Sequence, residues 1–583
     1  MPNTYEVEGT SATALFTLKV YRGEGACLLA MNWKSGEPTK DFVGFAIEYQ
    51  PPGSTTFRDV PNRLAFPQTD GEANPATLAT RLSPIQKFRW VHFPPAVAAP
   101  GDFVYRVTPV FMDPAGKLSY GDPQQASIDL QDETYPGELN VAFTRGFVSS
   151  QAFVDRFESA GDISTLLPAK ADDGLKFKPT HPKTKEALNW MGFEAARAVL
   201  SLLDEALKDP SAKVKVVAYD LNEPDVVARL EELGSRLQII IDDSGSHQPA
   251  TSAESQAAKR LTLSAGKSNV RRQHMGNLQH NKMIVADGDQ VKAAIGGSTN
   301  FSWRAFFVQA NNALIVRGAQ AIAPFAEAFD HYWSNTSNSV TEFAKSGSAV
   351  WLDMGLANID AKISFSPHSK QNAMLAGIAK DIAGNTQSSL FYSLAFLYQT
   401  KGAMQDAIKG IIADPKIFSY GISDKQVKDL TTGVKSTEGI DLQTPDGNVV
   451  PVWPSMLTKN VPEPFKSEPT GGGGTRMHHK FVVIDFNTDS ARVYLGSYNF
   501  SSAADTSNGE NLMVIRDRKV ATSYMVEALR LFDHNHFRVI EAAAKNSNQP
   551  LELALPPKAP GDTAWWEEDY TDPRKKRDRE LFA

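Results

Sequence analysis

Two stretches of the chain decide the fold: HNKMIVAD at residues 280–287 and HHKFVVID at residues 478–485. Each places a histidine and a lysine two positions apart, followed by four apolar residues and an aspartate. Successive side chains of a strand point to opposite faces, so the histidine and lysine of each stretch share one face. The sequence therefore predicts two strands, one in each half of the chain, that carry the same pair of polar side chains.

The sequence around these two stretches is also repeated. A strand, a helix and a second strand are predicted before each stretch, and a Gly-Ser-x-Asn turn follows each one. In the first half these are residues 213–219, 223–233, 237–241 and 297–300, and in the second half residues 389–396, 404–412, 416–422 and 496–499. Buried apolar strands alternating with helices are typical of a parallel α/β sheet. Agreement over so many elements predicts two copies of one α/β fold.

The paired side chains suit the chemistry of a phosphate diester. An imidazole can attack phosphorus or donate a proton, and a neighbouring ammonium group neutralises the oxygens on which charge builds up. Two copies supply both a nucleophile and an acid.

The duplicated His-x-Lys-x4-Asp pattern with its two Gly-Ser-x-Asn turns resembles the phospholipase D superfamily, over about residues 138–545. The resemblance implies an α/β/α sandwich in which the two halves meet at one pseudo-twofold site. It also implies a phosphohistidine intermediate, with no metal and no other cofactor.

The resemblance carries a set of site residues onto this chain. Its catalytic motif residues are His280, Lys282, Asp287, His478, Lys480 and Asp485. The two lysines are expected to hold the phosphoryl oxygens together with Asn300 and Asn499, while Ser298 and Ser497 steady the turns. We interpret the two aspartates as groups that fix the ends of the strands.

The two halves differ after the turn, where Glu510 of the second half aligns with Asn312 of the first. A carboxylate beside His478 would favour its protonated form, and a neutral amide near His280 would leave that imidazole free to attack. This reasoning predicts His280 as the nucleophile and His478 as the general acid.

The remaining sequence suggests two further units. Short β-rich runs broken by Pro and Gly over residues 1–135 predict an antiparallel sandwich that resembles a fibronectin type III or immunoglobulin-like module. The expected boundaries are then 138–345 for the first half, 346–545 for the second, and 546–583 for a C-terminal tail. The basic run at residues 574–579 is expected to be a solvated end.

Two substrate classes remain open. The net charge of −7 gives no general basic excess for nucleic acid, and aromatic residues at 301–307 suggest a place where a lipid could insert, although core packing explains them equally well. The first hypothesis is therefore a hydrolase that cleaves glycerophospholipids at a membrane surface and transfers phosphatidyl groups to other alcohols. The alternative is a nuclease or DNA-end phosphodiesterase, for which the basic residues between 259 and 282 would track a nucleic-acid backbone. A scaffold protein with a relict domain is a third, non-enzymatic alternative.

The first residues of the chain lack the basic flank and apolar run of a signal peptide, and no apolar run approaches the roughly 18 residues that span a bilayer. A cytoplasmic location is the default expectation, with signal-less secretion left open. The single cysteine, Cys27, excludes an internal disulfide. Because both histidines lie on one chain, a monomer is expected to be complete.

Overall fold

The structure is a computed structural model of the 583-residue chain. It describes residues 4–546 and 551–583, except residues 63, 68–77, 96–99, 131–132, 147–152, 154–155, 425–426, 428–439, 444–448 and 453–476.

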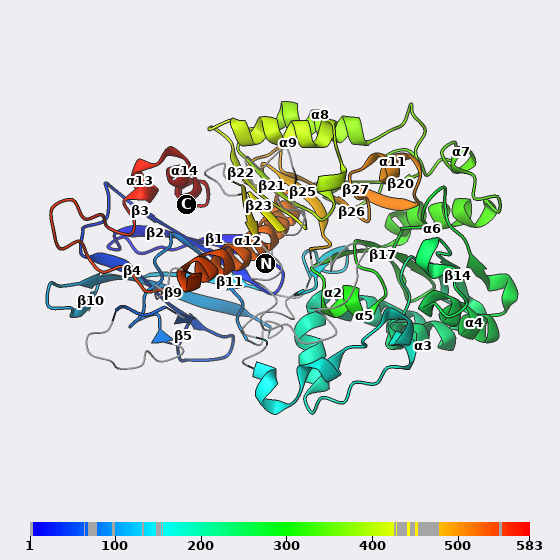
Figure 1. The fold of residues 1–583 in the computed structure, drawn as a ribbon, viewed down its shortest axis with the longest axis horizontal. Coiled ribbons are helices and arrows are strands. Elements are labelled where there is room, and N and C mark those ends of the chain that lie inside the picture. The colour runs from blue at the N-terminus through cyan, green and yellow to red at the C-terminus, as the bar shows by residue number, and fades with distance from the viewer. Residues whose placement is uncertain are drawn as a thin grey trace.

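The N-terminal region is an antiparallel β-sandwich, drawn in blue in Figure 1. One sheet has the order β1 (Glu6–Glu8), β2 (Phe16–Arg22), β3 (Cys27–Trp33) and β8 (Arg89–His92). The other contains β10 (Leu118–Tyr120), β9 (Asp102–Met112), β4 (Phe42–Gln50) and β5 (Arg58–Asp59), with β11 (Gln124–Asp129) also on β9, and a small pair joins β6 (Pro61–Asn62) to β7 (Leu78–Ala79). Alternating burial along β2 and β11 explains how one face of each sheet fills the core between them.

The first half of the α/β region is built on a seven-stranded sheet. Its order is β12 (Leu139–Phe143), β18 (Asn312–Arg317), β17 (Lys292–Gly297), β16 (Met283–Asp287), β13 (Lys213–Ala218), β14 (Leu237–Ile241) and β15 (Val270–Arg272). The helices of this half are α2 (Thr184–Lys208), α3 (Pro224–Glu232), α4 (Ala253–Ala265), α5 (Trp303–Phe307), α6 (Ala319–Ser334) and α7 (Val340–Phe343).

The second half repeats this plan on a nine-stranded sheet. Its order is β19 (Leu352–Asp353), β20 (Asp360–Ser366), β27 (Glu510–Arg516), β26 (Arg492–Gly496), β25 (Lys480–Ile484), β21 (Ser389–Leu394), β22 (Phe418–Ser423), β23 (Ile440–Gln443) and β24 (Val449–Val452). Its helices are α8 (Leu375–Asn385), α9 (Ala403–Ala413), α11 (Ser502–Thr506) and α12 (Arg518–Asn546). In Figure 1, α8 and α9 cover the outer face of this sheet. The fold is the duplicated α/β/α architecture with an added β-sandwich.

The parallel sheets expected from the sequence are in fact mixed sheets. Strands β13 and β14 pair in parallel, as do β21 and β22, but β16 and β25 both run antiparallel to their neighbours. An apolar strand sequence indicates that both faces of the strand are buried. It does not determine whether the strand runs parallel or antiparallel to its neighbours. The antiparallel hairpins matter for the site, because they carry the histidine motifs.

One hydrophobic core joins the two halves. It contains Phe325 and Phe329 of α6 together with Tyr524 and Leu529 of α12, all fully buried. The two α/β sheets therefore share a buried interface between them, which holds the two histidine motifs in a fixed relation.

The C-terminal segment is folded, which corrects the expected solvated end. Residues 564–583 form α13 (Glu568–Thr571) and α14 (Pro573–Leu581), and Trp566 packs into the core of the N-terminal sandwich. Arg579 within the basic run is buried, and Asp578 pairs with Arg89 of β8 at 2.9 Å. No helix in the described part of the chain is long and apolar enough to cross a membrane.

Candidate active site

The site lies where β16 and β25 begin. His280 and Lys282 lead into β16, and His478 precedes Lys480, the first residue of β25. The centroids of the two imidazole rings are 6.5 Å apart, with the ring planes inclined at 70° in an edge-to-face arrangement, and both histidines are almost fully buried. The structure thus brings together the two motifs that lie about 200 residues apart in the sequence.

His280 has a carboxylate partner. Its Nδ1 lies 2.7 Å from Glu510 Oε2 and 2.9 Å from Oε1. Ser497 donates a 2.6 Å hydrogen bond to the same carboxylate. Burial raises the pKa of Glu510, but the contacts with His280, Lys282 and Ser497 together outweigh burial and lower this pKa. The ionised carboxylate accepts the Nδ1 proton and leaves Nε2 as the ring nitrogen that is free to attack.

His478 has a neutral partner, Asn311. Its Nδ1 lies 2.7 Å from Asn311 Oδ1. The amide is oriented by its other end, because Asn311 Nδ2 donates to the carbonyl of Ala305 at 3.0 Å. His478 therefore donates its Nδ1 proton to the amide oxygen, and its Nε2 also faces the site unprotonated in the free protein.

These partners correct the assignment made from the sequence. Glu510 was assigned to His478 and Asn312 to His280, but the carboxylate belongs to His280 and the amide of Asn311 belongs to His478. Asn312 instead accepts from Ser298 N and donates to the hydroxyl of Tyr524, so it supports the turn from outside the site.

The pairing crosses between the halves because the backbones cross. Gln279, just before His280, bridges to Gly509, just before Glu510. Ala310, just before Asn311, bridges to Met477, just before His478. Each histidine is therefore oriented by the strand that follows the turn of the opposite half.

The two lysines lie beside the histidines. Lys282 donates through Nζ to the carbonyl oxygen of His280, and Lys480 Nζ donates to that of His478 at 2.8 Å. Burial lowers the pKa of Lys282 to about 8 and holds that of Lys480 well below its ordinary value. An incoming phosphate anion supplies the negative charge that two buried ammonium groups require.

Burial also keeps both imidazoles uncharged in the free protein. It lowers the pKa of His280 against the opposing pull of Glu510, and it holds the pKa of His478 well below its ordinary value with Lys480 adding to the effect. Both rings are thus available as bases or nucleophiles before substrate arrives.

The turn residues are divided between two roles. Ser298 and Ser497 accept hydrogen bonds from the backbone N–H groups of Asn312 and Asn511, which closes each turn onto the following strand. Asn300 donates through Nδ2 to Asp220 Oδ2 at 2.7 Å, so its amino group is already engaged. Asn499 Oδ1 is buried with no hydrogen-bond partner among the described residues.

The motif aspartates do not join the catalytic centre. The side chain of Asp287 is 56% exposed at the far end of β16, where it pairs with Lys292 at 2.6 Å. Asp485 is buried and accepts hydrogen bonds from the backbone N–H groups of Gln387, Ser388 and Ser389. Asp485 therefore holds the end of its strand, as the sequence predicts, and Asp287 forms a surface ion pair; among the described residues neither carboxylate is hydrogen-bonded to His280 or His478.

A second polar cluster adjoins the first-half motif, and the sequence reasoning missed it. His247 Nδ1 lies 2.8 Å from Asp242 Oδ2, and its Nε2 lies 3.3 Å from Asp220 Oδ1 and 3.9 Å from Glu254 Oε1. One ligand atom from each of Asp220, His247 and Glu254 lies within 4.8 Å of the others, so these three could hold a metal ion. Asp220 lies two residues after β13 and Asp242 directly follows β14, and this position at the strand ends is the signal that could have found them.

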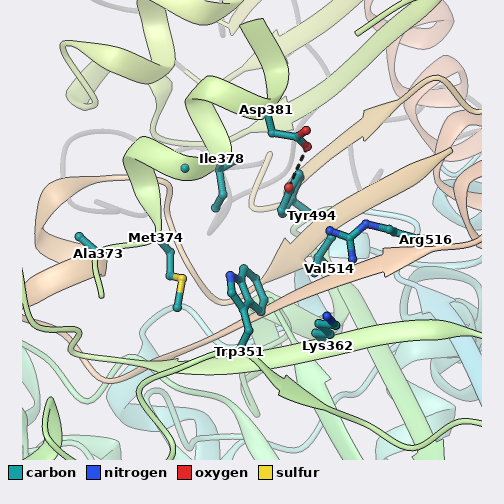
Figure 2. Close-up of a pocket in the computed structure, with 10 residues that line it drawn as sticks. Trp351, Lys362, Ala373, Met374, Ile378, Asp381, Tyr494, Val514 and Arg516 are labelled. Carbon is teal, nitrogen blue, oxygen red and sulfur yellow. Dashed lines mark hydrogen bonds between the residues drawn. The ribbon is translucent and has the colours of Figure 1, made fainter. Parts of the chain in front are cut away.

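A separate cavity of about 360 Å³ opens on the outer face of the second half, between α8 and the strands beneath it (Figure 2). Trp351 and Met374 form its apolar side, Lys362 and Arg516 lie at one edge, and Asp381 bonds to the hydroxyl of Tyr494 at 2.8 Å. Neither His280 nor His478 lines this cavity.

Residues 203–333 and 430–532 match a family model described as "Cardiolipin synthase, PLD-like domain". Over these two segments the chain is similar to a phospholipase D-like domain.

Individual proteins match over shorter or more distant stretches. A protein named "Phospholipase D" from Rickettsia felis is 44% identical over 48 residues, which is 8% of this chain and 22% of that protein. This chain thus spans about a fifth of the length of that curated relative. Phosphatidylserine synthase from Haemophilus influenzae has a structure that covers 59% of this chain and 85% of its own, at 13% identity and a TM-score of 0.39. The phospholipase D family member Nuc from Salmonella typhimurium covers 25% of this chain and 87% of its own, at 25% identity and a TM-score of 0.20.

Proposed function

We propose that this protein hydrolyses glycerophospholipids at a membrane surface through a covalent phosphohistidine on His280, and that a single chain suffices. The observation that carries the mechanism is the crossed pairing of His280 with Glu510 and of His478 with Asn311. A histidine that becomes bonded to phosphorus acquires positive charge, and the buried carboxylate is placed beside the ring that must bear it. The sequence predicts the same roles, with His280 as the nucleophile and His478 as the acid. However, it places the carboxylate of Glu510 beside the wrong histidine, His478.

The first step forms a nitrogen–phosphorus bond. His280 Nε2 attacks phosphorus, the bond from phosphorus to the headgroup oxygen breaks, and His478 gives its Nε2 proton to the leaving alkoxide. The anionic substrate favours the protonated form of His478 that this step needs, although burial opposes it in the free site.

The second step releases the product. His478 Nε2 takes a proton from water, the water oxygen attacks phosphorus, and the bond to His280 breaks to give phosphatidic acid. An alcohol in place of water gives transfer of the phosphatidyl group. Lys282 and Lys480 neutralise the phosphoryl oxygens in both steps.

The choice of a lipid substrate rests on two supports. The matching family model and the matching Rickettsia proteins carry names from phospholipid metabolism. In addition, the basic segment is largely used internally: Arg260 pairs with Glu231 at 2.6 Å, Arg272 donates to the backbone of His247, and Arg271 donates to the carbonyl of Trp333. These cations hold the fold, which leaves fewer of them to track a nucleic-acid backbone.

The aromatic run after Asn300 gives no support to either substrate. Phe301, Trp303 and Phe306 are buried in the core of the first half. The hypothesis that a lipid inserts there is wrong, and the alternative of core packing is correct.

The test compares substrates in parallel. Purified protein is incubated with mixed phospholipid vesicles and with single- and double-stranded DNA, in a chelator, beside the His280→Ala variant. His274→Ala is the matched control, because His274 bonds to Asp243 outside the site. The proposal is supported if the wild type and His274→Ala release headgroup alcohol and phosphatidic acid and His280→Ala does not. DNA cleavage with untouched lipids would make the protein a nuclease, and any activity that survives His280→Ala would refute the mechanism.

A further inference from the structure

Asp220 is a carboxylate at the edge of the catalytic centre that the mechanism above does not use. It follows Tyr219, whose ring centroid lies 4.7 Å from that of His280. Its side chain is 29% exposed, whereas those of Asp242 and Glu254 in the same cluster are 0% and 6% exposed. Asp220 is therefore the carboxylate of this cluster that a substrate in the site could reach.

The position of Asp220 is fixed from behind. His247 lies between two carboxylates, with its Nε2 3.3 Å from Asp220 Oδ1 and its Nδ1 2.8 Å from Asp242 Oδ2. Asp242 is fully buried, so this chain of contacts holds the Asp220 carboxylate in place.

Asp220 in turn fixes the amide of Asn300. Since a carboxylate accepts only hydrogen bonds, the atom 2.7 Å from Asp220 Oδ2 is the amino group of Asn300. The amide oxygen is buried and has no hydrogen-bond partner among the described residues, while the residue as a whole is 3% exposed. Asn300 was expected to donate to the phosphate, but here its donor is engaged and its acceptor is left without a partner.

Among the described residues of the second half, the position that matches Asp220 carries no carboxylate. Val217 pairs with Met283 and Ser393 pairs with Phe481, so strand register places Phe396 where the first half has Asp220. The ring of Phe396 contacts His478 and covers Lys480. Asp220 and Phe396 thus make the two matching positions of the site chemically different.

A carboxylate at the rim of a phosphate site repels the phosphate unless it serves another part of the substrate. We propose that Asp220 and Asn300 select phosphodiesters whose alcohol part carries a hydrogen-bond donor, a hydroxyl or an ammonium group, close to the phosphate. This inference rests on the phosphodiesterase activity proposed above, but it does not require that the substrate be a lipid.

The test uses substrate pairs that differ only in that donor. Short-chain phosphatidylglycerol is compared with the matching phosphatidylpropanol, and p-nitrophenyl glyceryl phosphate with p-nitrophenyl propyl phosphate, all in a chelator. The readout is the ratio of kcat/KM within each pair. We expect the wild type to favour the glyceryl member of at least one pair by roughly ten- to a hundredfold, the range for one hydrogen bond to a charged group.

Asp220→Asn should bring this ratio to within about threefold of one. Asn300→Ala should lower it as well, and it keeps the test valid if the first variant folds poorly. Asp243→Asn is the matched control, because Asp243 follows β14, the strand paired with β13, is 30% exposed and bonds to His274.

Three results would overturn the inference: no selectivity in either pair of the wild type, an equal fall in kcat/KM for both members in Asp220→Asn, or an equal change of the ratio in Asp243→Asn. Selective hydrolysis of the p-nitrophenyl pair with both lipids left intact would refute the lipid function and keep the inference. Absence of any His280-dependent hydrolysis would refute both.

Discussion

The carboxylate behind His280 gives the sharpest test of the mechanism. Glu510→Gln keeps the size of the side chain and removes its charge. The carboxylate lies 2.7 Å from His280 Nδ1 and is completely buried, so little solvent screens it. Taking about 4 Å between the carboxylate and the charge spread over the ring, and an effective dielectric constant of about 20, the lost attraction to a phosphohistidinium is about 4 kcal/mol. This corresponds to roughly a thousandfold loss in the rate of forming the intermediate.

The assay is single-turnover release of p-nitrophenol from a soluble diester, with the protein denatured at alkaline pH and the phosphorylated peptide located by mass spectrometry. The label is expected on His280 in the wild type, and it should form about a thousandfold more slowly in Glu510→Gln. Asn311→Asp reports on the other pair, because it places a carboxylate beside His478 and should disfavour proton donation by that ring. A loss below tenfold in Glu510→Gln, or a label on His478, would refute the reasoning.

Three further predictions concern pH and stability. Burial lowers the pKa of Lys282 to about 8, and the ammonium form binds the phosphate, so kcat/KM should fall as the pH rises through about 8. In a pH–rate profile, Lys282→Arg should shift this alkaline decrease to a pH more than one unit higher. Asp485→Ala leaves several backbone N–H groups without an acceptor and should lower the free energy of unfolding by roughly 3 kcal/mol in denaturant titrations, whereas Asp287→Ala should change it by less than about 0.5 kcal/mol. A chain ending at residue 550 loses Trp566 and Phe582 from two cores and should be less stable by roughly 5 kcal/mol or more, and an unchanged Tm would show that the C-terminal segment does not support the sandwich.

The elements around the motifs were predictable because their patterns are local. The strand expected at residues 213–219 is β13 (Lys213–Ala218), and the helix expected at 404–412 is α9 (Ala403–Ala413). Repetition of the motifs also indicated that the two halves share one fold, since each copy supports the interpretation of the other.

The partner of each histidine was not predictable by counting from the histidines. Asn312 and Glu510 both lie 32 residues after their histidines, but the hairpin between β25 and β26 is longer than the one between β16 and β17. Counting from the turn glycine avoids this slip, because Asn311 follows Gly297 by 14 residues and Glu510 follows Gly496 by 14. The crossing of partners between halves depends on tertiary bridges that no local pattern reports.

The asymmetry of the site follows from placing different residues at matching positions of two similar halves. One imidazole is backed by a carboxylate and the other by an amide, so among the described residues His280 is the histidine with a directly bonded counter-charge for a covalent phosphoryl bond. At a second pair of matching positions, Asp220 stands in the first half where the second half has Phe396. In a symmetric pair of motifs, either histidine could attack phosphorus, and neither would be set apart as the acid that protonates the leaving group. These substitutions at matching positions therefore assign one direction to the reaction, and exchanging them, as in Glu510→Gln with Asn311→Asp, should move the covalent label toward His478.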